Sequence, residues 1–441
     1  MSYQASIDYL YSRLPLFSRI GAAAIKNDLH NTLEICAFLD NPQHKIKTIH
    51  VAGTNGKGST SHMLAAIFQE AGYKTGLYTS PHLYDFRERI KINGAMCSED
   101  FVVAFTDKIK PLIEKIEPSF FEITVGMAFD YFAQEKCDIA IIETGLGGRL
   151  DSTNVIIPIL SIITNIGWDH MNLLGNTLEK IATEKAGIIK QNVPVVISER
   201  IAATTKVFEE KAKELNAPIY FSEDFLTTTH FNNNWHTASF EFTQTQIHLL
   251  DTPLFKKDFT ILCDLPGKYQ SKNLKGVLVA AQLLADMGWD INAEIITTAL
   301  TQIKNTTGLM GRWEIIQSSP NIVLDVAHNE HGITALLEQL ETTTYQQLHI
   351  VTGMVKDKDV DAVLSMLPKN ANYYFTQSHI PRALAAQELV LKATAAGLIG
   401  EAYEDVNTAL IQAKQNSQTN DLILVIGSVY LVAEVNRKLF I

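Results

Sequence analysis

Cysteine is scarce in this 441-residue sequence, and its four copies are scattered. Cys36, Cys97, Cys137 and Cys263 lie far apart, and no two of them have CxxC spacing. This pattern argues against a zinc knuckle and against the disulfide framework of a small secreted domain. We therefore expect reduced thiols and a cytoplasmic protein.

The sequence also lacks long apolar runs and an excess of basic residues. No uninterrupted apolar stretch approaches the roughly 18 residues of a membrane-spanning helix, and the N-terminus lacks the basic-then-apolar pattern of a secretory signal. The 37 lysines and arginines are outnumbered by 48 aspartates and glutamates, which gives a net charge of -11. We accordingly expect no nucleic-acid partner and no membrane partner, so an anionic ligand would need a local basic site.

Several well-known catalytic patterns are missing as well. The sequence has no Gly-x-Ser-x-Gly elbow, no His-Glu-x-x-His and no kinase-like His-Arg-Asp loop. It also has no convincing Gly-x-Gly-x-x-Gly followed by a ribose-binding acid. Hydrolase, zinc-protease, protein-kinase and dehydrogenase functions therefore lose support.

What the sequence does contain is an alternation of short apolar strands with longer helical patterns. This alternation predicts an α/β fold with a mainly parallel sheet, interrupted by a small antiparallel appendage from about 218 to 265. A helix from about 269 to 287 follows, and a polar segment at 304–311 is expected to be a linker. The expected strands of the first part are 46–51, 75–79, 138–143, 159–164 and 194–198.

A second α/β alternation fills the rest of the chain and predicts a C-terminal Rossmann-like domain. Its expected strands are 322–325, 348–353, 373–376 and 422–426. We expect two domains, 1–303 and 304–441, because each part is long enough to form its own core. In open α/β sheets, ligands bind at the carboxyl ends of the strands.

The most informative stretch is a glycine-rich loop, Gly53-Thr54-Asn55-Gly56-Lys57-Gly58-Ser59-Thr60, between the first strand and a helix. The glycines let backbone N–H groups approach phosphate oxygens, and the helix N-terminus adds partial positive charge. Lys57 can neutralise the outer phosphates, and a hydroxyl of Ser59 or Thr60 can face Mg²⁺ or a phosphate oxygen. The spacing departs from the common P-loop, because Val51 replaces its first glycine and Gly58 separates the lysine from the serine.

Other chemical residues follow the ends of the predicted strands. Glu143 precedes a second glycine-rich loop and suits a hard divalent cation, although it could simply cap backbone amides. Asp169 and His170 follow the next strand, where His170 is either a ligand or a structural histidine. Ser80 follows an earlier strand and is either a neutral metal ligand or an ordinary turn serine.

Three more residues have weaker local signals. On spacing alone, Lys185 is an exposed or salt-bridged lysine on an amphipathic helix. Arg312 can reach phosphates in forked geometry, and Asp325 can accept a hydrogen bond from a ribose or adenine group. Either of these two could equally belong to a surface ion pair.

Taken together, these motifs resemble the folylpolyglutamate synthase/dihydrofolate synthase family of the Mur ligase superfamily. The resemblance covers nearly the whole chain. The matching segments are 53–59, Ser80-Pro81-His82-Leu83, 143–151, Asp169-His170, 184–188 and Asp325-Val326-Ala327-His328-Asn329.

The resemblance implies an ATP- and folate-binding domain at 1–303 and a ligase domain at 304–441. It implies that Gly56, Lys57, Gly58 and Ser59 hold phosphates, and that Lys185 is carboxylated and serves as an oxygen ligand. The further implied roles are Mg²⁺ binding by Ser80, Glu143 and His170, ATP contacts from Asn273, Arg312 and Asp325 across the domain gap, and pterin or folate binding by Phe121, Glu122, Arg149, Leu150 and Asp151.

The implied reaction is the ATP-dependent joining of L-glutamate to a folate or dihydropteroate carboxylate through an acyl phosphate. Two alternatives stay open, namely another Mur-type ligase acting on a cell-wall precursor and a nucleotide-driven binding module. Two positions depart from the family, because Met310 and Glu330 stand where proline is usual. Their local geometry is therefore less certain. We expect a monomer.

Overall fold

The computed structural model describes residues 1–21, 26, 28–245, 253–356 and 359–440. The chain forms two compact units. The first consists of Met1–Asn232, Ser239–Asp264 and Gln270–Gly308, and the second of Asn233–Ala238, Leu265–Tyr269 and Leu309–Ile441. The division of labour expected between an ATP- and folate-binding domain and a ligase domain remains a prediction.

An eight-stranded sheet organises the first unit, with the order β4-β3-β2-β5-β1-β6-β7-β8. The six strands from β2 to β8 in this order run parallel, and β3 and β4 continue the sheet as antiparallel strands. The inner strands are buried along their whole length, which explains their continuous apolar sequences. The strand bounds are β1 Thr48–Ala52, β2 Thr75–Tyr78, β3 Ile90–Ile92, β4 Ala95–Met96, β5 Ile139–Glu143, β6 Leu160–Ile163, β7 Val195–Ile197 and β8 Ile219–Phe221.

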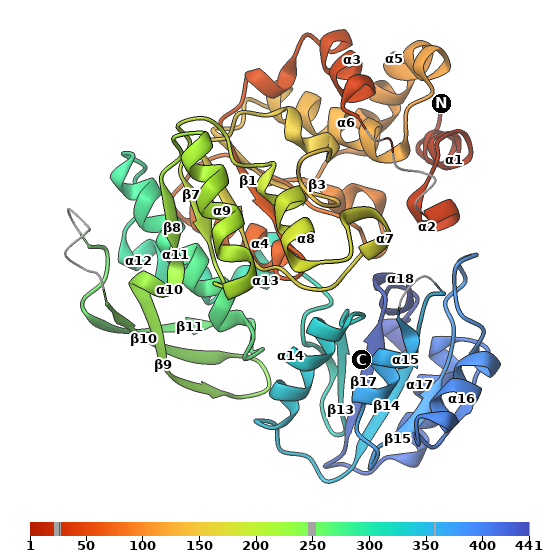
Figure 1. The fold of residues 1–441 in the computed structure, drawn as a ribbon. Helices are drawn as coiled ribbons and strands as arrows, with labels where there is room; N and C mark the ends of the chain where they lie inside the picture. The colour runs from red at the N-terminus through yellow and green to blue at the C-terminus, as the bar shows by residue number, and fades with distance from the viewer. Residues whose placement is uncertain (22–25, 27, 246–252, 357–358, 441) are drawn as a thin grey trace. The chain divides into compact units, whose positions relative to one another are not determined.

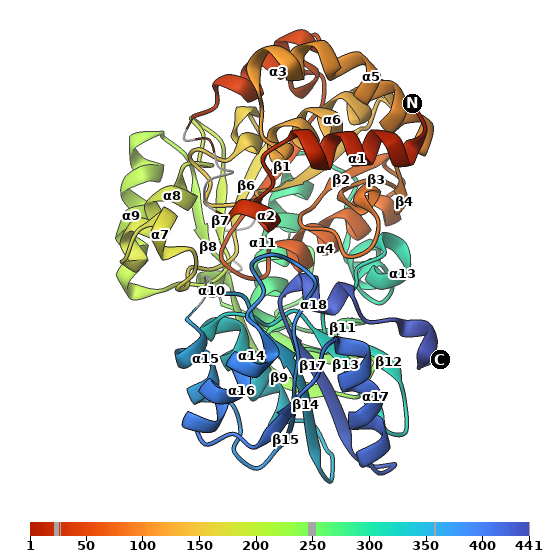
Figure 2. The same ribbon diagram turned by 90° about the vertical axis from the view of Figure 1, so that its right-hand side faces the viewer.

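Helices surround this sheet in separate groups. Figure 2 shows α1, α3, α5 and α6 gathered at one end of the first unit, where they share a core with β2 and β5. A second core joins α8 and α9 to β6 and β7. The helix bounds are α1 Tyr3–Arg13, α2 Phe17–Ile20, α3 His30–Phe38, α4 Lys57–Glu70, α5 Glu99–Ile116, α6 Phe120–Gln134, α7 Met171–Leu174, α8 Leu178–Ala186, α9 Ala202–Glu214, α10 Ser222–Phe225, α11 Gln270–Asp286, α12 Ala293–Leu300 and α13 Ile303–Thr307.

The antiparallel appendage forms a separate three-stranded sheet, drawn in green in Figure 1. It consists of β9 Leu226–Asn233, β10 Ala238–Gln244 and β11 Asp258–Cys263. Two expectations need correction. The segment 219–221 belongs to the main sheet as β8, and half of the expected 304–311 linker is the short helix α13, whose carbonyl at Thr307 accepts a 3.0 Å hydrogen bond from the buried Lys91 Nζ.

A six-stranded sheet organises the second unit, with the order β12-β13-β17-β14-β15-β16. Only its edge strand β12 is antiparallel, so the expected Rossmann-like alternation is confirmed. No described helix is long and apolar enough to cross a membrane. The bounds are β12 Glu314–Gln317, β13 Asn321–Asp325, α14 Glu330–Leu340, β14 Leu348–Gly353, α15 Val360–Met366, β15 Asn372–Phe375, α16 Ala386–Ala395, β16 Gly400–Ala402, α17 Val406–Asn416, β17 Leu422–Gly427 and α18 Val429–Ala433.

Candidate active site

The glycine-rich loop connects β1 to α4, as predicted. Two of its glycines adopt positive φ angles, 154° at Gly53 and 82° at Gly56. A Cβ atom at Gly53 would overlap the Thr164 hydroxyl, and one at Gly56 would overlap the Asn273 amide. Both positions therefore require glycine for two reasons, the backbone conformation and the lack of space.

Two lysine side chains converge on one carbonyl of this loop. Lys57 Nζ donates to the carbonyl oxygens of Gly53 at 3.0 Å and Thr54 at 3.1 Å. Lys185 Nζ donates to the same Gly53 oxygen at 2.8 Å. The Lys57 ammonium and the Lys185 amine thus gather N–H donors around one neutral oxygen in an acidic protein, which is what an anionic ligand needs.

Lys185 is fully buried, so the interpretation of it as an exposed lysine is wrong. Burial, together with the neighbouring Lys57 charge, lowers the pKa of its amine to about 7, and this value includes the opposing effect of Asp169 and Asp151. A neutral amine is therefore well populated near neutral pH. Nothing in the spacing of segment 184–188 alone signals this burial.

The segment after β6 holds the glycine-rich loop in place. The Thr54 N–H donates to the Asn165 carbonyl at 3.0 Å, and the Asn55 N–H donates to the Asn165 side chain at 2.8 Å. The Thr54 hydroxyl and Gly167 also exchange hydrogen bonds. Thr54 and Asn55 thus position the loop before α4, where the Thr60 N–H donates to the Gly56 carbonyl at 2.9 Å.

Helix α11 contributes Asn273 and a residue that the motif analysis missed. Gln270 Nε2 donates to Ser59 Oγ at 3.2 Å, and Asn273 Nδ2 donates to Gln270 Oε1 at 2.8 Å. Asn273 also lies against Gly56. The only sequence signal for Gln270 is its position one helical turn before Asn273.

Ser80 and Glu143 lie together, because β2 and β5 are neighbours in the sheet. The Ser80 N–H donates to Glu143 Oε2 at 3.3 Å, and the Glu143 side chain is buried. Glu143 therefore does bind a backbone amide, as the structural alternative proposed. The same contact brings together in space two residues that carry hard oxygen donors, the Glu143 carboxylate and the Ser80 hydroxyl.

Asp169 and His170 occupy the loop after β6. His170 has a φ of 49° and its N–H donates to Asp169 Oδ1 at 2.8 Å, while its Nε2 lies 3.7 Å from the same oxygen. Among the residues that the structure describes, no three His, Cys, Asp or Glu side chains form a metal site.

The predicted folate-binding residues divide into two groups. Glu122 caps α6 in a capping box with Ser119, and the buried Asp151 accepts the Leu146 N–H at 2.8 Å. These two carboxylates are thus engaged in holding local structure. Phe121, Arg149 and Leu150 are at least partly exposed; the Phe121 ring lies close to Gly145, and Arg149 forms a 2.9 Å ion pair with Glu184.

Asp325 and Arg312 lie in the second unit. Asp325 is buried, and its Oδ2 accepts the Trp313 N–H at 2.9 Å and the Tyr269 hydroxyl at 3.1 Å, so it is not part of a surface ion pair. Burial raises the pKa of this carboxyl, and the nearby Arg312 charge lowers it. Arg312 is half-buried, and its Nη1 donates to the Gly311 carbonyl at 3.1 Å. Their contacts with ATP stay a prediction.

The proline departure at Glu330 leaves the local turn intact. Asn329 caps α14 by accepting the Gly332 N–H at 2.8 Å, and Glu330 is the first residue of the helix. Proline is favoured at that position because its fixed φ fits and the N–H has no helical partner. A glutamate there is also compatible, since a negative charge is favourable at a helix N-terminus.

Comparison with known proteins identifies the class. Residues 51–281 match the Mur ligase middle domain, and residues 311–429 match the Mur ligase glutamate ligase domain. The chain is therefore a Mur ligase.

Within that class, the chain belongs to the dihydrofolate synthase/folylpolyglutamate synthase family. It is 34% identical to the dihydrofolate synthase/folylpolyglutamate synthase of Bacillus subtilis, over 99% of both chains. It is 30% identical to the folylpolyglutamate synthase of Lacticaseibacillus casei, over 100% of this chain and 99% of that relative.

Solved structures agree with this assignment. Escherichia coli FolC in complex with DHPP and ADP has 26% identity and a TM-score of 0.83, with 100% of this chain and 98% of the other covered. The Yersinia pestis bifunctional folylpolyglutamate synthase/dihydrofolate synthase is also similar. Another bifunctional folylpolyglutamate synthase/dihydrofolate synthase structure, with Mn, AMPPNP and L-glutamate bound, has 28% identity and a TM-score of 0.82, with 100% of this chain and 98% of the other covered.

Proposed function

We propose that this protein joins L-glutamate to the carboxylate of a dihydropteroate or folate molecule, with ATP as the second substrate. The carboxylate oxygen attacks the γ-phosphorus and ADP leaves, which produces an acyl phosphate. The neutral amine of glutamate then attacks the acyl carbon, and phosphate leaves as the amide forms. The observation that carries this proposal is the pair of lysines at the Gly53 carbonyl, beside a glycine loop of this family.

The phosphate-binding role falls to the start of α4. Gly56, Lys57, Gly58 and Ser59 would receive the phosphates, because this helix N-terminus directs N–H groups and partial positive charge toward an anion. Lys57 would exchange its two carbonyl contacts for phosphate oxygens and stabilise the charge that develops during phosphoryl transfer. Gln270 and Asn273 keep Ser59 and Gly56 in position.

A divalent cation fits the donors at the strand ends. Glu143 and Ser80 would hold Mg²⁺ with hard oxygen atoms, His170 would support it, and phosphate and water oxygens would complete the shell. When bound, Mg²⁺ neutralises negative charge on the phosphates. The Mn found together with AMPPNP in two related structures, one of them from Yersinia pestis, supports this role for a cation.

Lys185 is suited to carry a carboxyl group. Its pKa of about 7 leaves a neutral amine, which can attack the carbon of CO₂, form an N–C bond and release a proton. The product is a carbamate anion that replaces a positive charge by oxygen ligands. Burial beside the glycine loop would protect this group from water.

The pterin or folate would lie near the loop after β5. Phe121 offers an aromatic face, and Arg149 and Leu150 offer a cation and an apolar surface. Glu122 and Asp151 would act indirectly by holding α6 and the loop. In this arrangement only three of the five predicted residues contact the pterin or folate directly. Substitutions of Glu122 and Asp151 should therefore change the stability of the protein together with its affinity for the substrate.

The amino-acid substrate has a candidate cavity in the second unit. The cavity measures about 370 Å³, counting the solvent at its open side, and lies at the carboxyl ends of β13, β14 and β17, with His328, Asp359 and Ser428 in its wall. Parallel α/β sheets bind ligands at this edge. We assign L-glutamate to this cavity, and we expect Ser428→Ala to raise KM for glutamate with little change in KM for ATP.

One experiment separates the three candidate functions. Purified protein is incubated with ATP, Mg²⁺, glutamate and either dihydropteroate or tetrahydrofolate, and products are identified by mass. A ligase releases phosphate only when both the acceptor and glutamate are present. Phosphate release independent of glutamate would favour a nucleotide-driven binding module, and product formation only with UDP-linked muramyl substrates would favour a cell-wall ligase.

The expected monomer and the cytoplasmic location also belong to this proposal. All four cysteines are free and buried, which agrees with a reducing compartment. Light scattering of the purified protein should give the mass of one 49.0 kDa chain.

A further inference from the structure

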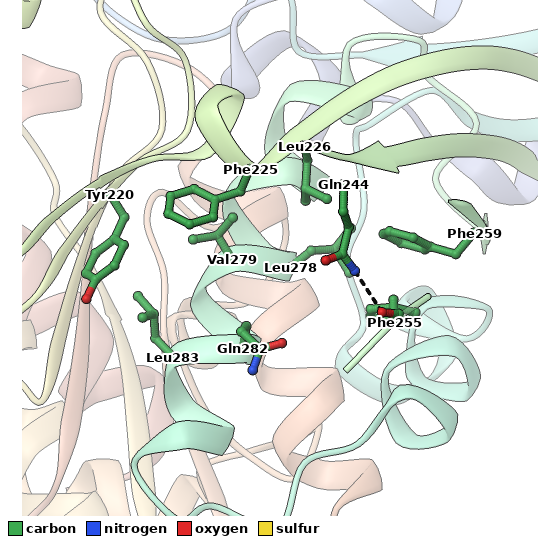
Figure 3. A pocket seen from close by; sticks show the side chains of 10 residues that line it. All are labelled: Tyr220, Phe225, Leu226, Gln244, Phe255, Phe259, Leu278, Val279, Gln282 and Leu283. Carbon is green, nitrogen blue, oxygen red and sulfur yellow. Dashed lines mark hydrogen bonds between the residues drawn. The ribbon is translucent and has the colours of Figure 1, made fainter. Parts of the chain in front are cut away.

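The first unit contains an apolar cavity that the proposed reaction does not use. It lies between helix α11 and the small antiparallel sheet, and Figure 3 shows its wall. The cavity encloses about 450 Å³, counting the solvent at its open side. Its lining consists of apolar and aromatic side chains and two glutamines, Gln244 and Gln282, and no charged side chain.

Gln244 leaves one polar atom in this cavity without a partner. Its Nε2 donates to the carbonyl oxygens of Phe255 at 3.0 Å and Lys256 at 3.3 Å. Its Oε1 is buried and has no hydrogen-bond partner within the described part of the chain. In Figure 3 this oxygen is turned away from Phe255, toward the Leu278 side of the cavity. A buried acceptor without a donor is costly, so the cavity favours an occupant that donates one hydrogen bond.

The other glutamine, Gln282, has hydrogen-bond partners for both of its side-chain polar atoms. Gln282 Oε1 accepts the Leu254 N–H at 2.8 Å, and its Nε2 donates to Asp286 at 3.0 Å. The remaining wall is aromatic on one side, where the Phe255 and Phe259 rings stack with centroids 4.3 Å apart. This lining suits a flat apolar molecule and disfavours folate, glutamate and nucleotides, whose charges would meet no counter-charge in the wall.

Helix α11 connects this cavity to the phosphate loop. Leu278 and Val279 line the cavity, while Gln270 and Asn273 at the start of the same helix contact Ser59 and Gly56. A packed helix moves as one element, so a ligand that fixes its middle also fixes its first turn. An occupant would therefore reduce the ordering that ATP binding requires at the loop.

We propose that this cavity binds a neutral aromatic molecule of one or two rings with a single N–H or O–H donor, and that its occupation increases the affinity for ATP. The donor pairs with Gln244 Oε1, and the rings pack between α11 and the Phe255–Phe259 pair. The site would act as a regulatory site, because no residue of the glycine loop lines the cavity and α11 connects the two.

Indole and 1-methylindole test the binding site, because 1-methylindole carries a methyl group in place of the N–H donor of indole. Isothermal titration of the whole protein should give a dissociation constant for indole below about 1 mM. The value for 1-methylindole should be at least about tenfold weaker, since Gln244 Oε1 then stays unpaired. Equal affinities for the two compounds, or no binding of indole, would overturn the proposal.

Two variants check the location. Gln244→Met removes the acceptor at similar volume and should abolish the preference for indole while leaving basal glutamate ligation unchanged. Val279→Trp fills the cavity and should prevent indole binding. Thermal unfolding shows whether each variant is folded, and if Val279→Trp is unfolded, Gln244→Met decides alone. Retention of the preference in a folded Gln244→Met variant would exclude this cavity.

The coupling is measured with a fluorescent ATP analogue. Saturating indole should lower the dissociation constant of this ATP analogue by roughly threefold or more. Saturating ATP should lower the dissociation constant of indole by the same factor. This result is independent of the ligase assay, so it stands or fails separately from the proposed reaction. Unchanged nucleotide affinity at saturating indole would contradict the regulatory role.

Discussion

The two α/β units use charge at their strand ends in opposite ways. In the first, two lysine amines meet at one carbonyl of the glycine loop, which prepares the site for a strongly negative ligand. In the second, the buried Asp325 accepts hydrogen bonds from Trp313 and Tyr269, so its charge is used to hold neighbouring side chains and backbone. We therefore expect the two similar parallel sheets to serve different purposes, a chemical site in the first unit and the positioning of neighbouring groups in the second.

The most severe test of this difference is removal of the Lys57 amine. We expect Lys57→Ala to reduce kcat by about 1000-fold, because the variant loses the cation that stabilises charge in phosphoryl transfer. Single-turnover ligation with ATP, glutamate and tetrahydrofolate measures this loss, with thermal unfolding as the control for folding. A wild-type rate in a folded variant would remove Lys57 from the mechanism.

The contrast also shows what a sequence can reveal about such sites. The glycine loop and Glu143 were predictable, because motif spacing and strand ends are local features. The burial of Lys185 and the Gln270–Ser59 contact depend on which helices pack on the sheet, and local sequence does not record this packing.

The secondary structure shows the same difference between local sequence signals and long-range packing. Strand β14 was predicted with its observed bounds, since the run 348–353 is apolar and buried throughout. Strands β12 and β16 were not predicted, because they are short and partly exposed. The segment of helix α13 was expected to be a linker, because its polar sequence has no apolar periodicity. In the structure a buried lysine from β3 holds the end of this helix, and the local sequence does not record that contact.

The second-largest effect is expected at Lys185. Lys185→Ala should lower kcat by about 100-fold if the residue acts as a carbamate, because a second set of oxygen ligands is lost. A short carboxylic acid such as acetate should restore part of the activity by occupying the vacated space. Lys185→Gln, which fills the space, should not be rescued, and rescue of both variants equally would contradict a carbamate.

The buried amine also predicts a pH dependence of stability. The folded-state pKa of Lys185 is about 7, below the unfolded value, so the unfolded chain binds more protons between pH 7 and about 10. The free energy of unfolding should therefore rise with pH in that window by about 2 kcal/mol from pH 7 to pH 9. Lys185→Met should lack this increase. Urea unfolding of both proteins without CO₂ and metal ions measures the difference, and parallel pH profiles would refute the assignment.

Glycine substitutions at the two ends of α4 separate strain from site geometry. Gly56 and Gly72 have similar φ angles, 82° and 86°. A Cβ at Gly56 overlaps the Asn273 side chain, whereas one at Gly72 meets no heavy atom within 4 Å in the described part of the chain. Both alanine variants should lose about 1 kcal/mol of stability from the backbone conformation, and Gly56→Ala should lose more because its Cβ overlaps Asn273. Only Gly56→Ala should also weaken ATP binding, by roughly tenfold in a titration, and equal affinities would show that the loop tolerates a side chain.

Asp325→Ala in the second unit should have the smallest effect on the reaction rate. Its effect on stability should nevertheless be clear. The substitution leaves the Trp313 N–H and the Tyr269 hydroxyl without their acceptor, which should lower the free energy of unfolding by about 2 to 3 kcal/mol. The control is Asp361→Ala, which breaks an exposed 3.0 Å ion pair with Lys392 in the same unit and should cost less than about 1 kcal/mol. Because Asp325 acts by positioning its neighbours, its loss should raise KM for ATP more than it lowers kcat. A loss of kcat as large as that of Lys57→Ala would instead give both units a direct role in charge stabilisation.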